Sequence, residues 1–182
     1  MEGASNIVLV GPMGAGKSAA GELLARRLGL PFVDVDAAIE AEAGARIAEL
    51  FRREGEGAFR ERESVLLARA LAVDGQVVAT GGGAVLDAGN RERLRARGVV
   101  AWLQADPETQ RSQLEGCRDR PLLEGSDRLP RLRALAAGRD PLYREVADIA
   151  MDTRGLDAVA VAEALAARVA GRWRAPAAER AS

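Results

Sequence analysis

The sequence predicts an α/β protein built on a parallel β-sheet. Five short apolar runs alternate with segments of helical periodicity, an order typical of strands joined by crossover helices. The runs lie at 6–10, 31–36, 76–80, 99–105 and 148–152. The glycine-rich segment GPMGAGKS (11–18) directly follows the first run. It occupies the strand-to-helix turn where parallel sheets bind phosphate groups.

The first strand and helix are predicted from a change in periodicity. NIVLV (6–10) is apolar throughout, which is typical of a buried strand. Apolar residues then recur at helical spacing from Ser18 to Leu28, and Gly29 ends that helix. PFVDVD (31–36) predicts the second strand, with two carboxylates at its end.

The middle of the chain predicts a long helical region and two more strands. Residues 37–72 have a helical pattern that is interrupted around Gly44 and at GEG (55–57). QVVAT (76–80) is the third strand and runs into three glycines. A short charged helix at 90–97 precedes the fourth apolar run.

The last third of the chain contains a loop between helices. Pro107 begins a helix that extends to Leu114. The segment 117–128 mixes charge, glycine and proline, which predicts a mobile loop. Residues 129–147 are helical with a break expected at Asp140-Pro141, and an alanine-rich helix spans Leu156 to Val169 after the fifth strand.

Length and composition predict one globular domain. The 182 residues are 48% hydrophobic and 29% charged, and we expect a core at about 5–170 with a disordered tail at 171–182. The net charge of −1 provides no overall field for nucleic acid. No apolar run reaches the ~18 residues of a membrane span. We therefore expect neither nucleic-acid nor membrane partners.

Cysteine and histidine usage excludes several kinds of site. The chain has one cysteine, Cys117, and no histidine. This excludes an internal disulfide, a Cys–His nucleophile and histidine bases. Cys117 is interpreted as structural or incidental. A lone cysteine fits a reducing compartment, and the N-terminal segment lacks the positive stretch of a secretory signal. We expect a cytoplasmic protein.

GPMGAGKS matches the phosphate-binding pattern G-x-x-x-x-G-K-[ST] and lies between a predicted strand and a predicted helix. In this motif the glycines let backbone N–H groups face a phosphate, the lysine reaches the β/γ-phosphates, and the hydroxyl binds Mg²⁺. Lys17 is the only lysine among 26 basic residues. Because a guanidinium is wider than an ammonium group, arginine would not replace lysine in such a cradle.

Two carboxylates follow the second predicted strand. Asp34 and Asp36 alternate in VDVD, so both side chains would face the cleft at the carboxyl end of the sheet. One would hold Mg²⁺ through water, and the other would orient a substrate hydroxyl and take its proton. The alternative is that Asp36 is a helix N-cap.

Two further segments carry candidate binding residues. Arg60 and Glu63 are neighbours on a predicted helix, where a surface ion pair is the simpler alternative. VVATGGG (77–83) places three glycines at the end of a buried strand. This pattern indicates a close backbone approach to a ligand.

These residues together resemble the shikimate kinase family from Ile7 to about Val169. The resemblance depends on six motifs that occur in the family's order and spacing. They are GPMGAGKS, FVDVD (32–36), FRERE (59–63), TGGG (80–83), RPLL (120–123) and RDPLY (139–143). It implies a three-layer P-loop kinase fold, with a five-stranded parallel sheet of order 2-3-1-4-5 flanked by helices and a mobile lid at about 115–128.

The resemblance also implies transfer of the γ-phosphoryl group of ATP to the 3-hydroxyl of shikimate, in aromatic amino acid synthesis, by a monomer. It implies that Lys17, Asp36 and Arg120 are catalytic, and that Ser18 and Asp34 hold Mg²⁺. The implied substrate contacts are Asp36, Arg60, Glu63, Gly81, Gly82, Gly83 and Arg139. The implied ATP contacts are Gly14, Ala15, Gly16, Lys17, Ser18, Ala19 and Arg120.

The chain departs from the family pattern at one position. Relatives often have an arginine shortly before the lid that packs on adenine, whereas Gln113 lies seven residues before Arg120 here. Arg111 or Arg154 is therefore expected to supply the adenine contact.

Two alternatives to a shikimate kinase remain. One is a kinase for another hydroxylated acid such as gluconate, which the paired arginines at 60 and 139 and the glycine run argue against. The other is a binding module that senses shikimate or a nucleotide without turnover. The presence of Lys17, Asp36 and Arg120 argues against that alternative.

Overall fold

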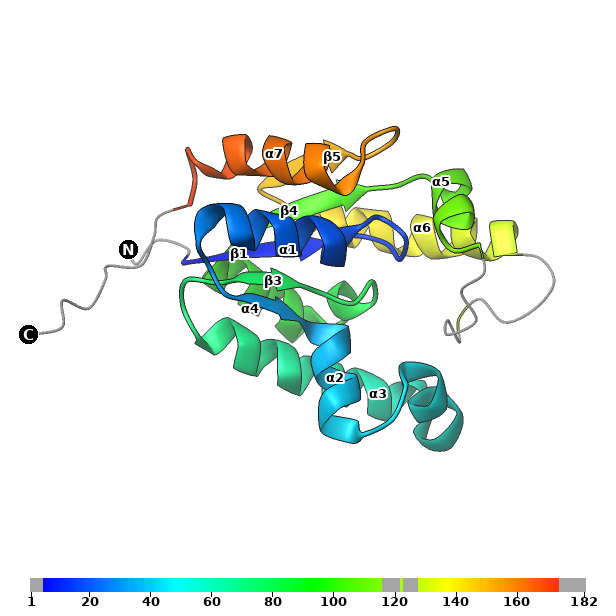
Figure 1. Ribbon diagram of the computed structural model, residues 1–182. Helices are drawn as coiled ribbons and strands as arrows, with labels where there is room; N and C mark the ends of the chain where they lie inside the picture. The colour runs from blue at the N-terminus through cyan, green and yellow to red at the C-terminus, as the bar shows by residue number, and fades with distance from the viewer. Residues whose placement is uncertain (1–4, 116–121, 123–127, 174–182) are drawn as a thin grey trace, which may run out of the picture.

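The fold is a parallel sheet covered by helices on both faces, as seen in a computed structural model that describes residues 5–115, 122 and 128–173 (Figure 1). The described residues form a five-stranded sheet of order β2-β3-β1-β4-β5, with every neighbouring pair parallel. The strands are β1 (Asn6–Val10), β2 (Phe32–Asp34), β3 (Val77–Ala79), β4 (Gly98–Gln104) and β5 (Ile149–Asp152). The predicted strand order is confirmed.

The strand register brings the candidate site to one edge of the sheet. Leu9 of β1 aligns with Ala79 of β3, and Ala79 aligns with Asp34 of β2. The chain therefore leaves these three strands side by side, into the phosphate loop, the glycine run and the segment after Asp34. Parallel sheets bind ligands at this carboxyl edge.

Helices cover the two faces of the sheet and make three layers. α1 (Lys17–Leu28) and α7 (Ala158–Val169) cover one face, while α3 (Ile47–Ala72), α4 (Ala88–Arg97) and α6 (Arg128–Val146) cover the other. Alternate residues of a strand supply the two cores, as Val8 does on one face and Leu9 on the other.

The predicted helical region at 37–72 consists of two helices. α2 (Val35–Ala43) follows β2 directly and ends at Gly44, which is left-handed at φ 64°. α3 continues to Ala72 but is kinked at Gly55, where φ is 83°. Both predicted interruptions are confirmed, because only glycine adopts these backbone angles at little cost.

β2 and α6 differ from the prediction. The second strand ends at Asp34 rather than Asp36, since Val35 already begins α2. α6 continues through Pro141 without the expected break. Its buried residues Arg139, Tyr143 and Val146 lie on both sides of the proline, so packing maintains the helix although one backbone donor is missing.

The remaining short elements lie near the site. α5 (Pro107–Gln113) is capped by Asp106, whose side chain accepts from the Thr109 N–H at 2.7 Å. A 3₁₀ turn at Ala84–Leu86, which the sequence did not predict, follows the glycine run.

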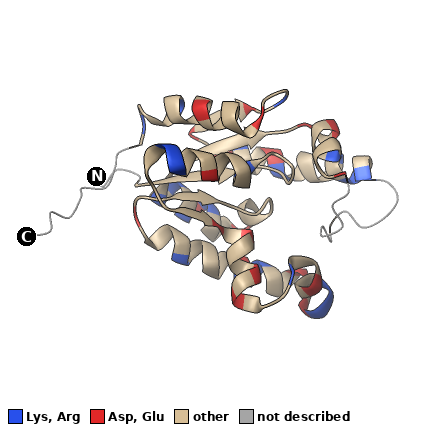
Figure 2. Ribbon diagram, viewed as in Figure 1, with Lys and Arg blue, Asp and Glu red and all other residues tan. Residues whose placement is uncertain are grey.

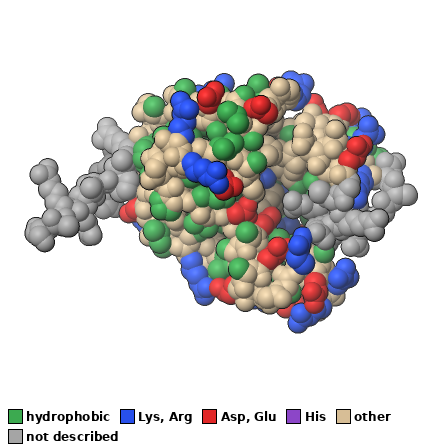
Figure 3. Space-filling view, in the orientation of Figure 1, with side chains coloured by type: hydrophobic (Ala, Val, Ile, Leu, Met, Phe, Trp, Pro, Cys, Tyr) green, Lys and Arg blue, Asp and Glu red, His purple; other side chains and the backbone are tan. Residues whose placement is uncertain are grey.

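Some predictions lie outside the described residues. Cys117, Arg120 and the tail beyond 173 are among them, as is most of the predicted lid at 115–128. Among the described residues, no helix has the length and apolarity to cross a bilayer. Acidic and basic residues both occur along the outer helices (Figure 2), and the face shown in Figure 3 mixes both signs of charge.

Candidate active site

The phosphate loop joins β1 to α1. Gly14 and Gly16 have φ of 77° and 80°, which curls the backbone in a way that residues with a Cβ rarely allow. Gly16 occupies the N-cap of α1 and brings no capping side chain. The first N–H groups of α1 are therefore available to an anion at the positive end of the helix.

Lys17 folds back over this loop. Its Nζ donates to the carbonyl oxygens of Gly11 and Pro12, both at 2.8 Å, and the residue is only 8% exposed. The ammonium group thus lies close to backbone on two sides.

Ser18 and Asp34 lie side by side below the loop. The Ser18 hydroxyl donates to Asp34 Oδ2, while Asp34 Oδ1 accepts from the Ala37 N–H at 3.1 Å and caps α2. The N-cap alternative therefore applies to Asp34, not to Asp36, which lies in the first turn of α2. Asp34 therefore uses one carboxylate oxygen to accept from Ser18 and the other to cap α2.

These two side chains fit a magnesium site. A hydroxyl and a carboxylate are hard oxygen ligands, which Mg²⁺ prefers beside phosphate and water oxygens. In the described part of the chain, no cluster of three or more acidic or cysteine side chains could hold a metal by itself. An ion here would therefore depend on the nucleotide and water for its other ligands.

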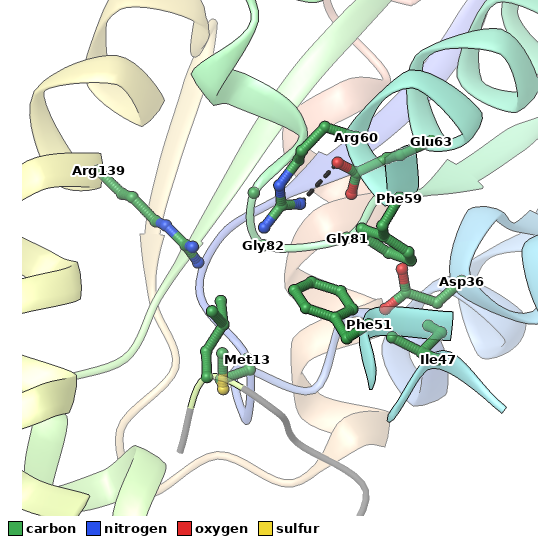
Figure 4. A pocket seen from close by; sticks show the side chains of 12 residues that line it. Met13, Asp36, Ile47, Phe51, Phe59, Arg60, Glu63, Gly81, Gly82 and Arg139 are labelled. Carbon is green, nitrogen blue, oxygen red and sulfur yellow. Dashed lines mark hydrogen bonds and ion pairs between the residues drawn. The ribbon is translucent and has the colours of Figure 1, made fainter. Parts of the chain in front are cut away.

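A second pocket opens between α3, α6 and the glycine run (Figure 4). We call it the acid pocket because two of the side chains that line it, Asp36 and Glu63, are acidic. Arg139 and Arg60 point into it from different sides (Figure 4). Its lining comprises Met13, Asp36, Ile47, Phe51, Phe59, Arg60, Glu63, Gly81, Gly82, Gly83, Leu122 and Arg139.

Arg60 and Glu63 form a partly buried ion pair within this pocket. Arg60 Nη1 donates to Glu63 Oε2 at 2.7 Å, and the side chains are 21% and 1% exposed. The surface-pair alternative is therefore wrong. Glu63 Oε1 has no hydrogen-bond partner among the described residues. Burial raises the pKa of Glu63, and the nearby Arg60 guanidinium opposes that rise.

The glycine run makes room for these charged groups. A Cβ on Gly81 would lie 2.7 Å from Asp36 Oδ1 and still closer to Glu63 Oε1. A Cβ on Gly83 would collide with the Arg60 guanidinium. The sequence predicted close approach of this backbone to a ligand. The structure shows that the pocket's own side chains already approach it closely.

Arg139 closes the other side of the acid pocket. It is 5% exposed and comes from α6, one turn before Tyr143. The Tyr143 hydroxyl donates to the Gly82 carbonyl oxygen at 2.5 Å. Sequence reasoning missed this tyrosine, although its position four residues after Arg139 placed both on one helix face.

The acid pocket meets the phosphate loop at Asp36. A neighbouring pocket, which we call the phosphate pocket, shares Met13, Asp36 and Gly82 with it. The other residues of the phosphate pocket are Gly14, Gly16, Lys17, Ser18, Ala19, Asp34, Thr80, Gln113 and Leu114. A carboxylate thus stands between a phosphate cradle and a small chamber with two arginines.

Comparisons with known proteins identify the family of this chain. The family model described as Shikimate kinase matches residues 13–170. The chain belongs to the shikimate kinase family. It is 57% identical over 150 residues to the shikimate kinase of Symbiobacterium thermophilum, covering 81% of this chain and 86% of the relative. It is 47% identical over 174 residues to that of Xanthomonas euvesicatoria pv. vesicatoria, covering 96% and 97%.

A solved structure supports the same family. Shikimate kinase from Acinetobacter baumannii in complex with shikimate superposes with a TM-score of 0.90 at 42% identity, covering 92% of this chain and 93% of that chain. As a shikimate kinase family member, the chain is an ATP-dependent kinase that acts on an alcohol group, and its fold is the P-loop kinase fold.

One more cavity in this shikimate kinase fold lies beside the phosphate pocket. It runs between the phosphate loop, α5 and the turn before α7, and we call it the base pocket. Leu156 is 45% exposed and offers an apolar surface there. The lining residues are Gly14, Ala15, Gly16, Ala19, Thr109, Gln113, Thr153, Leu156, Asp157, Ala158 and Val161.

The two expected adenine contacts lie elsewhere. Arg111 is exposed and lines neither the base pocket nor the phosphate pocket. Arg154 lines a separate cavity, where it pairs with Asp152 at 2.5 Å and Asp106 at 3.8 Å. Gln113 instead lines both nucleotide-side pockets. The signal in the sequence was its position seven residues before Arg120.

Proposed function

We propose that this chain transfers the γ-phosphoryl group of ATP to the 3-hydroxyl of shikimate and forms shikimate 3-phosphate. The observation that carries the proposal is the position of Asp36 at the junction of the phosphate pocket and the acid pocket. An acceptor in the acid pocket would present a hydroxyl to the carboxylate and to the phosphate loop together.

The acid pocket suits a small anion with hydroxyl groups. Arg60 and Arg139 come from separate helices and point into the same space. Two guanidinium groups provide the planar donors that a carboxylate prefers. The backbone N–H groups of Gly82 and Gly83 would contact the ring, and Glu63 would support the hydroxyl side.

Phosphoryl transfer requires that the two substrates are positioned in line and that charge on the transferred group is stabilised. The hydroxyl oxygen forms a bond to the γ-phosphorus, the bond from that phosphorus to the ADP oxygen breaks, and the hydroxyl proton passes to Asp36. Lys17 would hold the β/γ-phosphates, with Gly14, Ala15, Gly16 and Ala19 around them. Arg120, which lies outside the described residues, would reach the transferred group from the lid.

Magnesium completes the nucleotide side of the proposal. Ser18 would bind the ion through its hydroxyl, and Asp34 would hold one of its water ligands. When bound, the ion neutralises charge on the β- and γ-phosphate oxygens. Because every side chain named comes from one chain, a monomer would suffice, and we expect it in the cytoplasm.

A direct transfer assay tests the proposal. Purified protein with ATP, Mg²⁺ and either shikimate or gluconate is followed by ADP release and by mass spectrometry of the product. We expect one phosphate on shikimate and none on gluconate. Transfer to gluconate alone would identify another acid kinase. ATP binding without transfer to either acid would identify a binding module.

A further inference from the structure

Tyr143 lies behind the acid pocket and contacts two parts of it. It is fully buried, and its hydroxyl donates to the Gly82 carbonyl oxygen at 2.5 Å. Arg139 lies one helical turn before Tyr143 on α6, and both residues line one small cavity. One hydroxyl group therefore connects α6 to the glycine run after β3, two segments that are far apart in the sequence.

The tyrosine ring itself is held in place by its neighbours. It packs against Trp102 of β4, with ring centroids 5.8 Å apart and planes at 31°. The Arg144 guanidinium lies over the Trp102 ring at 5.8 Å from its centroid. Burial also raises the pKa of Tyr143, so the hydroxyl keeps its proton and remains a donor to Gly82 at working pH.

The bond to Gly82 also fixes the direction of the next N–H group. In a trans peptide the C=O of one residue and the N–H of the next point to opposite sides, and the described residues contain no cis peptide. Tyr143 lines a separate small cavity and not the acid pocket, whereas Gly83 lines the acid pocket. Holding the Gly82 carbonyl toward Tyr143 therefore turns the Gly83 N–H away from it, toward the acid pocket.

We propose that Tyr143 is a positioning residue that holds Arg139 and the Gly82–Gly83 peptide in one arrangement for an anionic substrate. It touches neither the substrate nor the phosphates. Its hydroxyl ties α6, which carries Arg139, to the peptide that carries the Gly83 N–H. This inference rests on the proposed function, because it takes the acid pocket as the acceptor site.

The test is Tyr143→Phe, which keeps the ring and removes the hydroxyl. Loss of the hydrogen bond to the Gly82 carbonyl should raise the KM for shikimate about three- to tenfold. The KM for ATP should remain within about twofold, because the phosphate loop is unchanged. The KM for the uncharged methyl ester of shikimate should change little, so the enzyme should discriminate less between the acid and the ester. An equal rise in KM for the acid and for the ester would overturn the proposal.

Trp102→Phe is the matched control for packing. It disturbs the same aromatic contact but leaves the Tyr143 hydroxyl and Arg139 in place. We expect a lower melting temperature with an unchanged KM for shikimate. If Trp102→Phe and Tyr143→Phe raise that KM equally at equal loss of melting temperature, the hydroxyl has no positioning role.

A double-mutant cycle with Arg139→Ala tests the coupling directly. If Tyr143 acts through Arg139, its effect on shikimate binding should shrink when the arginine is absent. Additive losses would overturn the proposal. Wild-type protein that does not phosphorylate shikimate would refute the proposed function itself. An active wild type with an unaffected Tyr143→Phe variant would refute only the positioning role.

Discussion

Asp36 and Glu63 come from different helices and converge on Cα of Gly81. A Cβ at that position would lie 2.7 Å from Asp36 Oδ1 and would overlap Glu63 Oε1. Two carboxylates so close repel each other when both are ionised. Arg60 and Arg139 supply the opposing charge around Glu63. The absent side chain at 81 is therefore what permits this acidic centre beside the phosphate loop.

Gly81→Ala should inactivate the enzyme while leaving it folded. The added methyl group must displace Asp36 or Glu63, and a shift of about 1 Å at a reacting group can cost about 10²-fold in rate. We expect kcat/KM for shikimate to fall by about 10²-fold or more. The measurement is steady-state kinetics with circular dichroism of the folded variant. A variant with wild-type kcat/KM would show that the carboxylates need not approach residue 81.

Gly57→Ala is the matched glycine control. Gly57 lies within α3, and a Cβ there would meet nothing within 4 Å. Alanine in a helix interior is favoured over glycine by about 0.5–1 kcal/mol. The free energy of unfolding should therefore rise by about that amount, with kcat/KM unchanged.

Glu63 should make the protein less stable as the pH rises. Burial raises its pKa above the ordinary value of 4.5; Arg60 opposes this rise and Asp36 reinforces it. The folded state thus binds this proton more tightly than the unfolded chain does. The contribution to stability is fully present below the unfolded pKa and is lost as the pH rises through the folded pKa.

Glu63→Gln removes this ionisation and keeps the shape. Relative to wild type, the variant should gain melting temperature as the pH rises from the ordinary value of 4.5 towards neutral, because it has no charge to bury. Thermal melts of both proteins across that range provide the measurement. The exposed neighbour Glu61 gives the control variant Glu61→Gln, which removes a carboxylate from the surface of the same helix. A difference between Glu63→Gln and wild type that stays constant with pH would contradict the raised pKa of Glu63.

Local sequence patterns predicted much of the fold and the nucleotide side of the candidate site. The phosphate loop could be located because its glycines and Lys17 lie in one contiguous segment. The interruptions at Gly44 and Gly55 could be located because glycine is the residue that adopts positive φ most easily, and both residues do have positive φ. Each of these features is encoded by neighbouring residues, so a single sequence carries it.

The features that the sequence did not predict depend on tertiary packing. The helix continues through Pro141 because flanking residues of α6 are buried against the rest of the protein. Asp34, rather than Asp36, caps α2 because β2 stops one residue before the helix starts. The bond from Tyr143 to Gly82 spans 61 positions, and no local pattern indicates a contact at that separation.

Lys17→Arg should nearly abolish turnover although the charge is kept. Nζ lies 2.8 Å from two backbone carbonyl oxygens in a site that is 8% exposed, and the planar guanidinium needs more room. We expect kcat to fall about 10²–10³-fold, the scale of losing one charge-stabilising donor. The reverse exchange Arg26→Lys, on the exposed side of the same helix, should leave kcat unchanged. Near-normal kcat in Lys17→Arg would refute the steric account of the lone lysine.

Gln113→Ala should weaken ATP binding and spare shikimate binding. Gln113 lines the base pocket and the phosphate pocket but not the acid pocket, so its amide can contact only the nucleotide side. Loss of one neutral hydrogen bond predicts a rise of about three- to tenfold in the KM for ATP. Arg111→Ala, two residues earlier and exposed, should leave both KM values unchanged. If Arg111→Ala raises the KM for ATP and Gln113→Ala does not, the arginine supplies the adenine contact after all, and α5 must move when the nucleotide binds.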